Sequence, residues 1–316
     1  MGVALVSTVC IALACCNGEA WLPALLDSLR AQTVRDFRVL WQDDGSTDGT
    51  VGLLERIGAQ DGRFSPGCEQ GKHLGAKGNF LSLMRQADAP YVALCDQDDV
   101  WHRDRLEAGL RALAGAEEAF GADTPLLAHS DCRLTDADGH VFAESFFRHQ
   151  GWSADAVTLP QLLVQNNVTG CTVLMNRALC RLCADHALPE RLFMHDWFIA
   201  QTAAAFGKIL CLPEPLVDYR QHGGNAVGAS GKGLLARGLE AFVHRRRVRD
   251  RIRLCYRQAE FLLDAYASLL PAAPEDCIRA FLRTEHLPKL SRLAALRRGG
   301  YRMQSRTARL GQMIFG

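Results

Sequence analysis

Apolar residues in the first 130 positions come in short unbroken runs, and each run is followed by a segment with apolar residues three or four positions apart. Unbroken runs are typical of strands buried on both faces, and the wider spacing is typical of helices. Their alternation predicts an α/β fold with a mostly parallel sheet flanked by helices. We expect strands at 3–16, 37–41, 91–95 and 126–130, and helices at 21–31, 51–57, 75–88 and 104–113.

The pattern continues to about residue 220 and then changes character. Further strands are expected at 168–175 and 209–217, and further helices at 177–186 and 196–206. From Leu234 onward the spacing is helical and rich in arginine, with a break at Pro271–Pro274. Glycines between 223 and 233 mark a boundary. We therefore predict an α/β domain over 1–228 and a basic helical extension over 229–316.

The apolar run at 3–16 has fourteen residues, fewer than the roughly 20 that cross a bilayer, and no basic segment precedes it. It fits a buried strand better than a signal peptide or an anchor. The twelve cysteines are scattered through predicted core segments, where a free thiol behaves as a small apolar group. Both observations favour a cytoplasmic protein.

Charge is unevenly distributed. Residues 231–316 hold 18 Lys and Arg against 7 Asp and Glu, whereas the rest of the chain holds 18 against 28. The Arg-rich segment 244–253 lacks interleaved aromatic residues and any nucleic-acid-binding motif, so nucleic acid is not expected as a partner. Two interpretations stay open for 237–258: a peripheral contact with anionic lipid at the inner face of the membrane, or a solvated helix face.

Three carboxylates follow the predicted strand 91–95 within four residues: Asp96, Asp98 and Asp99. In open α/β sheets the carboxyl ends of strands border the ligand crevice. Such a group repels itself unless a cation or hydrogen-bond donors neutralise it, and hard oxygen ligands favour Mg²⁺ or Mn²⁺. The alternative is a solvated loop that caps the next helix.

A second acidic segment, Asp43–Asp48, follows the strand at 37–41. By itself it also fits a turn with a helix cap. It lacks the GxxxxGK[ST] pattern of a phosphate-binding loop, and no GxGxxG follows the first strand. A carboxylate here instead suits a ribose hydroxyl or a base N–H.

These segments together resemble family 2 glycosyltransferases of the GT-A fold. The resemblance spans about residues 3–228, with its motifs in the expected order. It is carried by Cys16-Asn17-Gly18, Leu26-Asp27-Ser28-Leu29, Gln42 to Thr50, and Asp96-Gln97-Asp98-Asp99-Val100-Trp101. Asn167 to Cys171, His195-Asp196-Trp197 and Tyr219 to Asn225 are similar to the branch described as rhamnosyltransferases of bacterial surface polysaccharide assembly.

The resemblance implies contacts with a nucleotide-sugar donor. Asp44 and Asn17 would contact the nucleotide, and Asp96 would face the ribose or the sugar. Asn79 is a further candidate for the donor site, weighed against a solvated loop. Ala14-Cys15-Cys16 stands where the family usually has Thr or Pro and an aromatic residue, so the identity of the base stays open.

The resemblance also implies a metal and a base. Asp98 and Asp99, with His222 approaching from a C-terminal loop, would hold Mg²⁺ or Mn²⁺ bridging the diphosphate. Asp196 occupies the place of the catalytic base. A divalent cation stabilises the charge on a departing diphosphate, and a carboxylate that deprotonates the incoming hydroxyl allows one direct, inverting displacement.

The branch favours TDP-rhamnose as the donor and a growing polysaccharide or lipid-linked glycan as the acceptor. His195 and Trp197 are weaker candidates for contacting that acceptor, against structural roles at a helix start and in the core. A nucleotidyltransferase acting on sugar phosphates is the rival function, but the Gly-rich basic loop that it usually needs is not visible after Cys16. An inactive sugar-binding module would have lost the carboxylates, which are present.

Overall fold

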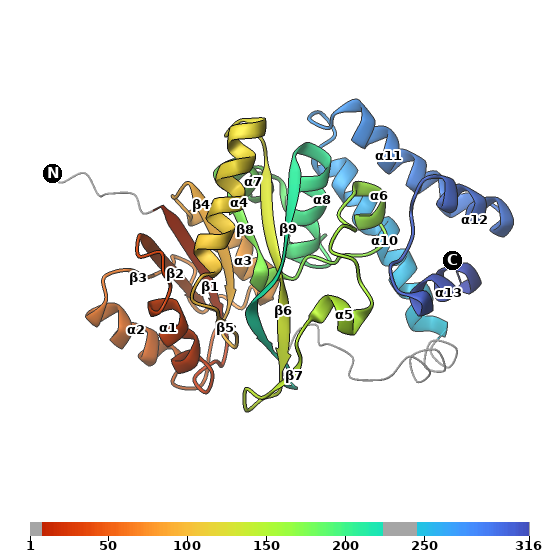
Figure 1. Ribbon diagram of the computed structural model, residues 1–316. Coiled ribbons are helices and arrows are strands. Elements are labelled where there is room, and N and C mark those ends of the chain that lie inside the picture. Colours follow the sequence, from red (N-terminus) through yellow and green to blue (C-terminus); the bar gives the residue numbers. More distant parts are fainter. Residues whose placement is uncertain (1–7, 224–244, 316) are drawn as a thin grey trace.

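The computed structural model describes residues 8–223 and 245–315. Within them the chain forms a mixed, mostly parallel sheet with helices on both faces (Figure 1). The strands are β1 (Val9–Cys15), β2 (Phe37–Asp43), β3 (Phe64–Pro66), β4 (Tyr91–Asp96), β5 (Val100–Trp101), β6 (Leu126–Thr135), β7 (Val141–Ala143), β8 (Leu174–Asn176) and β9 (Lys208–Arg220). They follow the order β3-β2-β1-β4-β8-β6-β9-β5, and β7 pairs with β6.

The N-terminal half agrees with the predicted alternation. Parallel pairing joins β1 to β2 and β4, and β2 to β3. The predicted helices are present as α1 (Leu22–Arg30), α2 (Thr50–Gln60), α3 (Gly75–Gln86) and α4 (Arg105–Phe120). The strand expected at 3–16 is confirmed from Val9 to Cys15, and its first residues, 3–7, lie outside the described part of the chain.

The strand expected at 168–175 is wrong over most of its length. The chain forms a short 3-10 helix, η1 (Gly170–Thr172), and only β8 is extended. The Asn166 side chain bonds both the N–H and the C=O of Val168, and the Thr172 hydroxyl donates to the carbonyl of Thr169. Such local bonds replace strand pairing with turns. The segment is apolar because it is buried, and burial alone did not require a strand.

The two helices predicted between residues 177 and 206 are confirmed. The segment expected at 177–186 is α7 (Arg177–His186), and the one at 196–206 is α8 (His195–Phe206). Short helices α5 (Phe146–Gln150), α6 (Leu159–Leu162) and η2 (Thr284–His286), which the pattern did not predict, lie in the connections. The C-terminal helices are α10 (Arg245–Ala265), α11 (Ala272–Arg283), α12 (Lys289–Arg298) and α13 (Arg306–Phe315).

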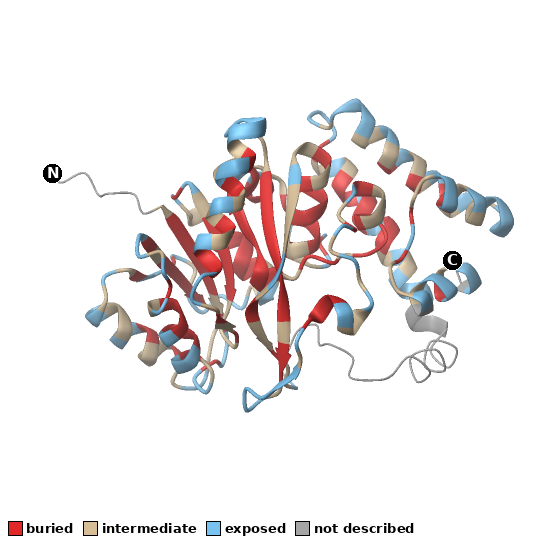
Figure 2. Ribbon diagram, in the orientation of Figure 1, coloured by how far each residue is buried: buried red, intermediate tan, exposed pale blue. Residues whose placement is uncertain are grey.

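Two apolar layers sandwich the sheet, and the alternation along β1 shows why its run is unbroken. Val9, Ile11 and Leu13 face the layer formed with α1, α2 and α4, whereas Cys10 and Ala12 face the layer formed with α3, α7 and α8. Successive strand residues point to opposite faces, so a strand covered on both sides is apolar throughout. Figure 2 shows the central strands buried and the outward helix faces exposed.

The C-terminal helices share the second layer. Tyr256 and Phe261 of α10, Phe281 of α11 and Leu296 of α12 are buried in the same apolar cluster as α3 and α8. The boundary predicted at 228/229 lies outside the described residues, as does Asn225. No helix in the described ranges combines the length and apolar character needed to span a bilayer.

Candidate active site

A cavity of about 1240 Å³ opens where β1, β2 and β4 end. Asp44, which follows β2, lines it together with Asp96 and Asp98, which lie at the end of β4 and just beyond it. Asp196 lines the same cavity from the first turn of α8. This confirms that the two acidic segments face one space, because the carboxyl ends of parallel strands meet at one edge of the sheet.

The loop after β2 is held by its own aspartates. The buried Asp43 carboxylate accepts the backbone N–H groups of Gly45 and Ser46, 2.9 and 2.8 Å away, which closes the turn. The Asp44 carboxylate accepts the N–H groups of Leu74 and Gly75, where α3 begins. A carboxylate at a helix start is favoured because the first N–H groups lack partners within the helix. Asp44 thus has a structural role as well as a place in the cavity wall.

Asn17 and Asn79 also line the cavity, and both are engaged within the protein. The Asn17 side-chain oxygen accepts the N–H of Thr47 at 2.8 Å, which joins the loops after β1 and β2. Asn79 is buried, and its amide exchanges hydrogen bonds of 2.7 and 3.0 Å with the side chain and carbonyl of Gln42. Its hydrogen bonds are therefore made to the buried Gln42 of β2, and a contact with the donor stays a prediction.

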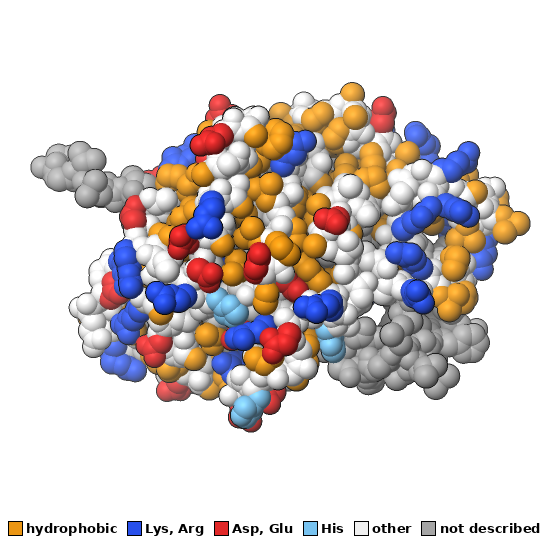
Figure 3. All heavy atoms as spheres, viewed as in Figure 1, with side chains coloured by type: hydrophobic (Ala, Val, Ile, Leu, Met, Phe, Trp, Pro, Cys, Tyr) orange, Lys and Arg blue, Asp and Glu red, His pale blue; other side chains and the backbone are white. Residues whose placement is uncertain are grey.

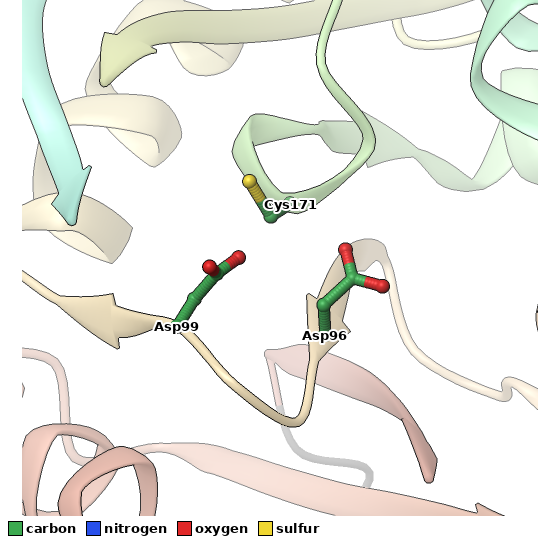
Figure 4. A group of neighbouring side chains, drawn as sticks. All are labelled: Asp96, Asp99 and Cys171. Carbon is green, nitrogen blue, oxygen red and sulfur yellow. The ribbon is translucent and has the colours of Figure 1, made fainter. Parts of the chain in front are cut away.

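The segment after β4 brings three groups together from two parts of the chain. Asp96, Asp99 and Cys171 of η1 each offer a ligand atom, and these atoms lie within 4.8 Å of one another. Figure 4 shows the Asp96 and Asp99 carboxylates on the side of their segment that faces Cys171 of η1. The predicted set was Asp98, Asp99 and His222, so the structure shares Asp99 with it and adds Asp96 and Cys171. Cys171 belongs to a motif noted in the sequence, but its residue type suggested only core packing.

Burial and mutual repulsion dominate the electrostatics of this cluster. Burial, followed by the charges of Asp98 and Asp196, raises the pKa of Asp96 to about 8. Burial and the charges of Asp98 and Asp96 raise the pKa of Asp99 well above its usual range. Asp99 Oδ1 accepts the N–H of Arg220, whereas Oδ2 is buried without a hydrogen-bond partner. An unpartnered buried carboxylate oxygen beside a second carboxylate fits a divalent cation.

Asp98 faces the cavity and interacts with His222. The imidazole Nε2 lies 2.7 Å from Asp98 Oδ2, and the ring stacks on Trp21 with 5.0 Å between the ring centroids. His222 follows β9, whose pairing with β5 brings it beside the acidic segment. The structure therefore brings Asp98 and His222 together as expected, and their role as metal ligands stays a prediction.

Asp196 is a carboxylate with a strongly altered acidity. Burial raises its pKa to about 7, although backbone N–H groups of Trp197 and Gly170 stabilise its charged form. The N–H of Trp197 donates to Asp196 Oδ1 at 2.6 Å. A carboxyl group that titrates near neutral pH is suited to taking a proton from an alcohol that is held close to it.

The two neighbours of Asp196 differ in their surroundings. Trp197 is buried and donates its indole N–H to the Leu162 carbonyl at 2.6 Å, so packing accounts for it. His195 stacks on Phe80, burial lowers its pKa to about 3, and neither ring nitrogen has a hydrogen-bond partner. Both residues line the cavity. A contact of either residue with the acceptor stays a prediction.

Two features of the site were not predicted from the sequence: a buried arginine and a set of arginines from a C-terminal helix. Arg105 at the start of α4 is buried, and its guanidinium donates to the Cys171 carbonyl and interacts with the charges of Asp96 and Asp99. Arg251, Arg253 and Arg257 of α10 line the cavity, although their sequence suggested a helix surface facing solvent or lipid. In the sequence, the only sign of the buried Arg105 is its position directly before the apolar pattern of the helix that follows.

Residues 10–133 match the sequence model of the family Glycosyl transferase family 2. This segment contains β2, β4, nearly all of β1, and the three aspartates at and after the end of β4. This segment of the chain is therefore similar to glycosyltransferase family 2. The predicted recognition is thereby confirmed.

Curated relatives cover a larger part of the chain. An uncharacterized protein of Mycobacterium tuberculosis is 27% identical over 209 residues, 65% of this chain and 56% of its own length. The chain thus spans little more than half of that relative. The dTDP-rhamnosyl transferase RfbG of Shigella flexneri is 24% identical over 222 residues, 68% of this chain and 73% of its own.

Solved structures agree on the fold. S. aureus TarS 1–349 in complex with UDP-GlcNAc superposes with a TM-score of 0.57 at 17% identity, covering 88% of this chain and 72% of that one. The mannosyltransferase PcManGT from Pyrobaculum calidifontis, in complex with GDP-Man and Mn²⁺, gives 0.53 at 17% identity, covering 98% and 84%. These are GT-A glycosyltransferases, so the predicted GT-A fold is confirmed.

Proposed function

We propose that this protein transfers a sugar from a nucleotide-sugar donor to a hydroxyl group of a glycan, with inversion at the anomeric carbon. One observation carries the proposal: Asp44, Asp96, Asp98 and Asp196 all line one cavity, and Asp196 has a pKa of about 7. The match of residues 10–133 to glycosyltransferase family 2 and the GT-A fold of the chain support this proposal.

The donor lies over the ends of β1, β2 and β4 in this proposal. Asn17 and Asp44 would contact the nucleoside, because both line the cavity together with Ala14 and Cys16. Asp96 at the end of β4 is placed for the ribose or the sugar. Asn79 supports this region through Gln42.

The residues of the acidic cluster fit a divalent cation, Mg²⁺ or Mn²⁺. Asp98 and Asp99 would supply carboxylate oxygens, with His222 next to Asp98, and the Asp96 carboxylate lies within 4.8 Å of that of Asp99. Mg²⁺ and Mn²⁺ prefer oxygen ligands to sulfur, so the carboxylates rather than the Cys171 thiol would hold the ion. When bound, such an ion supplies positive charge that stabilises a diphosphate leaving group. The Mn²⁺ in PcManGT supports this assignment.

Asp196 acts as the general base. Its carboxylate accepts the proton of the acceptor hydroxyl as the oxygen bonds to the anomeric carbon and the bond to the diphosphate oxygen breaks. Because the chain needs no covalent intermediate, the single displacement inverts the anomeric centre. Burial assists this step, since it raises the basicity of the carboxylate toward the working pH.

The substrates follow from the relatives. RfbG is named a dTDP-rhamnosyl transferase, which supports TDP-rhamnose as the donor. We infer that the acceptor is a growing surface polysaccharide or a lipid-linked glycan, modified on the cytoplasmic side of the membrane.

Thermal unfolding with a panel of nucleotide sugars tests the proposal, because a ligand of the folded state raises the melting temperature by mass action. With Mn²⁺ present, TDP-rhamnose should raise it in the wild type and not in Asp98→Ala. Asp27→Ala is the matched control, since Asp27 is exposed on α1. Release of nucleoside diphosphate should follow the same pattern. If no nucleotide sugar shifts the melting temperature of the wild type, the proposed function is wrong.

A further inference from the structure

One face of α10 lines the cavity that contains Asp196. Asp250, Arg251, Arg253, Leu254 and Arg257 all border it. Positions 250, 253, 254 and 257 are three or four residues apart and therefore lie on the same side of a helix. The arginine-bearing face of α10 is thus directed to the space where a substrate binds.

Residues next to this face of α10 fix the position of the helix. The Cys255 thiol donates to the Val164 carbonyl at 3.3 Å, and Gln258 donates to the Gln201 side chain at 3.2 Å. Gln258 Oε1 accepts the N–H of Phe193 at 3.1 Å, three residues before Asp196. Hydrogen bonds thus attach α10 to the segment that leads into α8. The arginines are held at the cavity by the core of the protein.

Positive charge is in excess on this wall. Arg253 lies 3.9 Å from Asp250, with both side chains 70% exposed, which is a weak ion pair. Arg251 and Arg257 form no ion pair with an acidic side chain in the part of the chain that the structure describes. Other exposed arginines do, as Arg191 shows with Asp264. Two guanidinium groups at the cavity are therefore available to a ligand.

This wall lies away from the proposed nucleotide site. In Figure 1, α10 lies beside α6 and α8, at the other end of the molecule from β1 and β2. Asn17 and Asp44 follow these two strands in the chain. Figure 3 shows basic side chains gathered over the C-terminal helices. If the donor occupies the strand ends, as in the proposed function on which this inference rests, then α10 meets the acceptor.

We propose that Arg251, Arg253 and Arg257 form an anion-binding part of the acceptor site, and that the acceptor carries a phosphate or diphosphate group. Guanidinium groups bind phosphate oxygens through paired hydrogen bonds, and neighbouring arginines match its multiple oxygens and charge.

A membrane surface fits these arginines less well. A helix that lies on lipid needs an exposed apolar face. In the described part of α10, the apolar residues Tyr256, Ala259 and Leu262 are buried in the core. Of the segment 237–258 considered for a membrane contact, residues 237–244 lie outside the described residues.

Calorimetric binding of geranyl diphosphate tests the proposal, with the donor site filled by TDP and Mn²⁺. The variant R251Q/R253Q/R257Q should bind at least tenfold more weakly than the wild type, and R257Q alone should show part of this loss. R249Q is the matched control, because Arg249 is exposed on α10 and does not line the cavity. It should bind within about twofold of the wild type. Wild-type affinity in the triple variant would overturn the proposal.

Cosedimentation with phosphatidylglycerol vesicles distinguishes a lipid surface from a phosphorylated acceptor. A triple variant that loses vesicle binding while keeping its affinity for geranyl diphosphate would overturn the proposal in favour of a membrane contact. The melting-temperature shift with TDP-rhamnose should be equal in the wild type and the triple variant. If that shift is absent in both while diphosphate binding still depends on the arginines, the proposed function fails and the anion site stands.

Discussion

His222 Nε2 lies 2.7 Å from Asp98 Oδ2, although 124 positions separate the two residues in the chain. The contact forms because β9 pairs antiparallel with β5, which follows the acidic segment directly. Stacking on Trp21 fixes the imidazole from its other side. A side chain at the end of the α/β domain thus orients a carboxylate near its middle.

Replacing His222 by Ala should weaken Mn²⁺ binding by about tenfold or more, since partners that orient metal-binding carboxylates typically contribute this much. Titration with Mn²⁺, followed by electron paramagnetic resonance, measures the change. His286→Ala is the control, because His286 is exposed on η2 and does not line the cavity. Equal affinities in wild type and His222→Ala would show that the histidine has no part in the metal site.

Replacing Asp196 by Asn should lower kcat by roughly 100-fold or more and leave donor affinity unchanged, because the amide cannot accept the acceptor proton. Single-turnover transfer and equilibrium binding of TDP-rhamnose separate the two effects. Asp185→Asn on α7 is a control for the loss of one charge, since Asp185 does not line the cavity. Transfer at the wild-type rate in Asp196→Asn would exclude Asp196 as the base.

The transfer rate should rise with pH through about 7, where the Asp196 carboxyl loses its proton. Burial raises this pKa from 3.8, so the base is mostly protonated at pH 6 and mostly charged at pH 8. A profile of kcat against pH with saturating donor and Mn²⁺ measures the midpoint. A midpoint near 4 would contradict the assignment, because an ordinary carboxyl group titrates there.

Metal-free protein should lose stability as pH rises above about 4. The pKa of Asp99 is higher in the folded protein than in the unfolded chain, where it is 3.8. The protonated Asp99 side chain therefore contributes fully to folding stability below pH 3.8, and this contribution is lost as the pH rises toward the pKa of the folded protein. Asp99→Asn should therefore be more stable than the wild type at pH 8, by about 1–3 kcal/mol, and gain less from Mn²⁺.

Urea unfolding at pH 5 and pH 8 measures this difference. Asp27→Asn, which changes an exposed carboxylate on α1, should leave the pH dependence as it is in the wild type. A variant Asp99→Asn that is less stable than wild type at pH 8 would indicate that the charged form is well accommodated without a cation.

Local patterns predicted most of the N-terminal half because β1, β2 and β4 are buried on both faces, and helices such as α1 bury one face. The prediction failed at 168–175, where an equally apolar segment turns as η1. There the apolar character reflects burial in the core, and side-chain hydrogen bonds of Asn166 decide the backbone path. Short elements such as α6 carry too few residues to show a period.

The sequence by itself determined that strands end in aspartates, that these ends share one edge of a parallel sheet, and that Asp196 opens a helix. These follow from residue order and from the fixed geometry of strands and helices. Only the tertiary structure decided that Cys171 meets Asp96 and Asp99, and that Arg251, Arg253 and Arg257 of α10 face the cavity. Both contacts join segments far apart in the chain, and which segments meet depends on how whole faces pack, a property that no local pattern of residues contains.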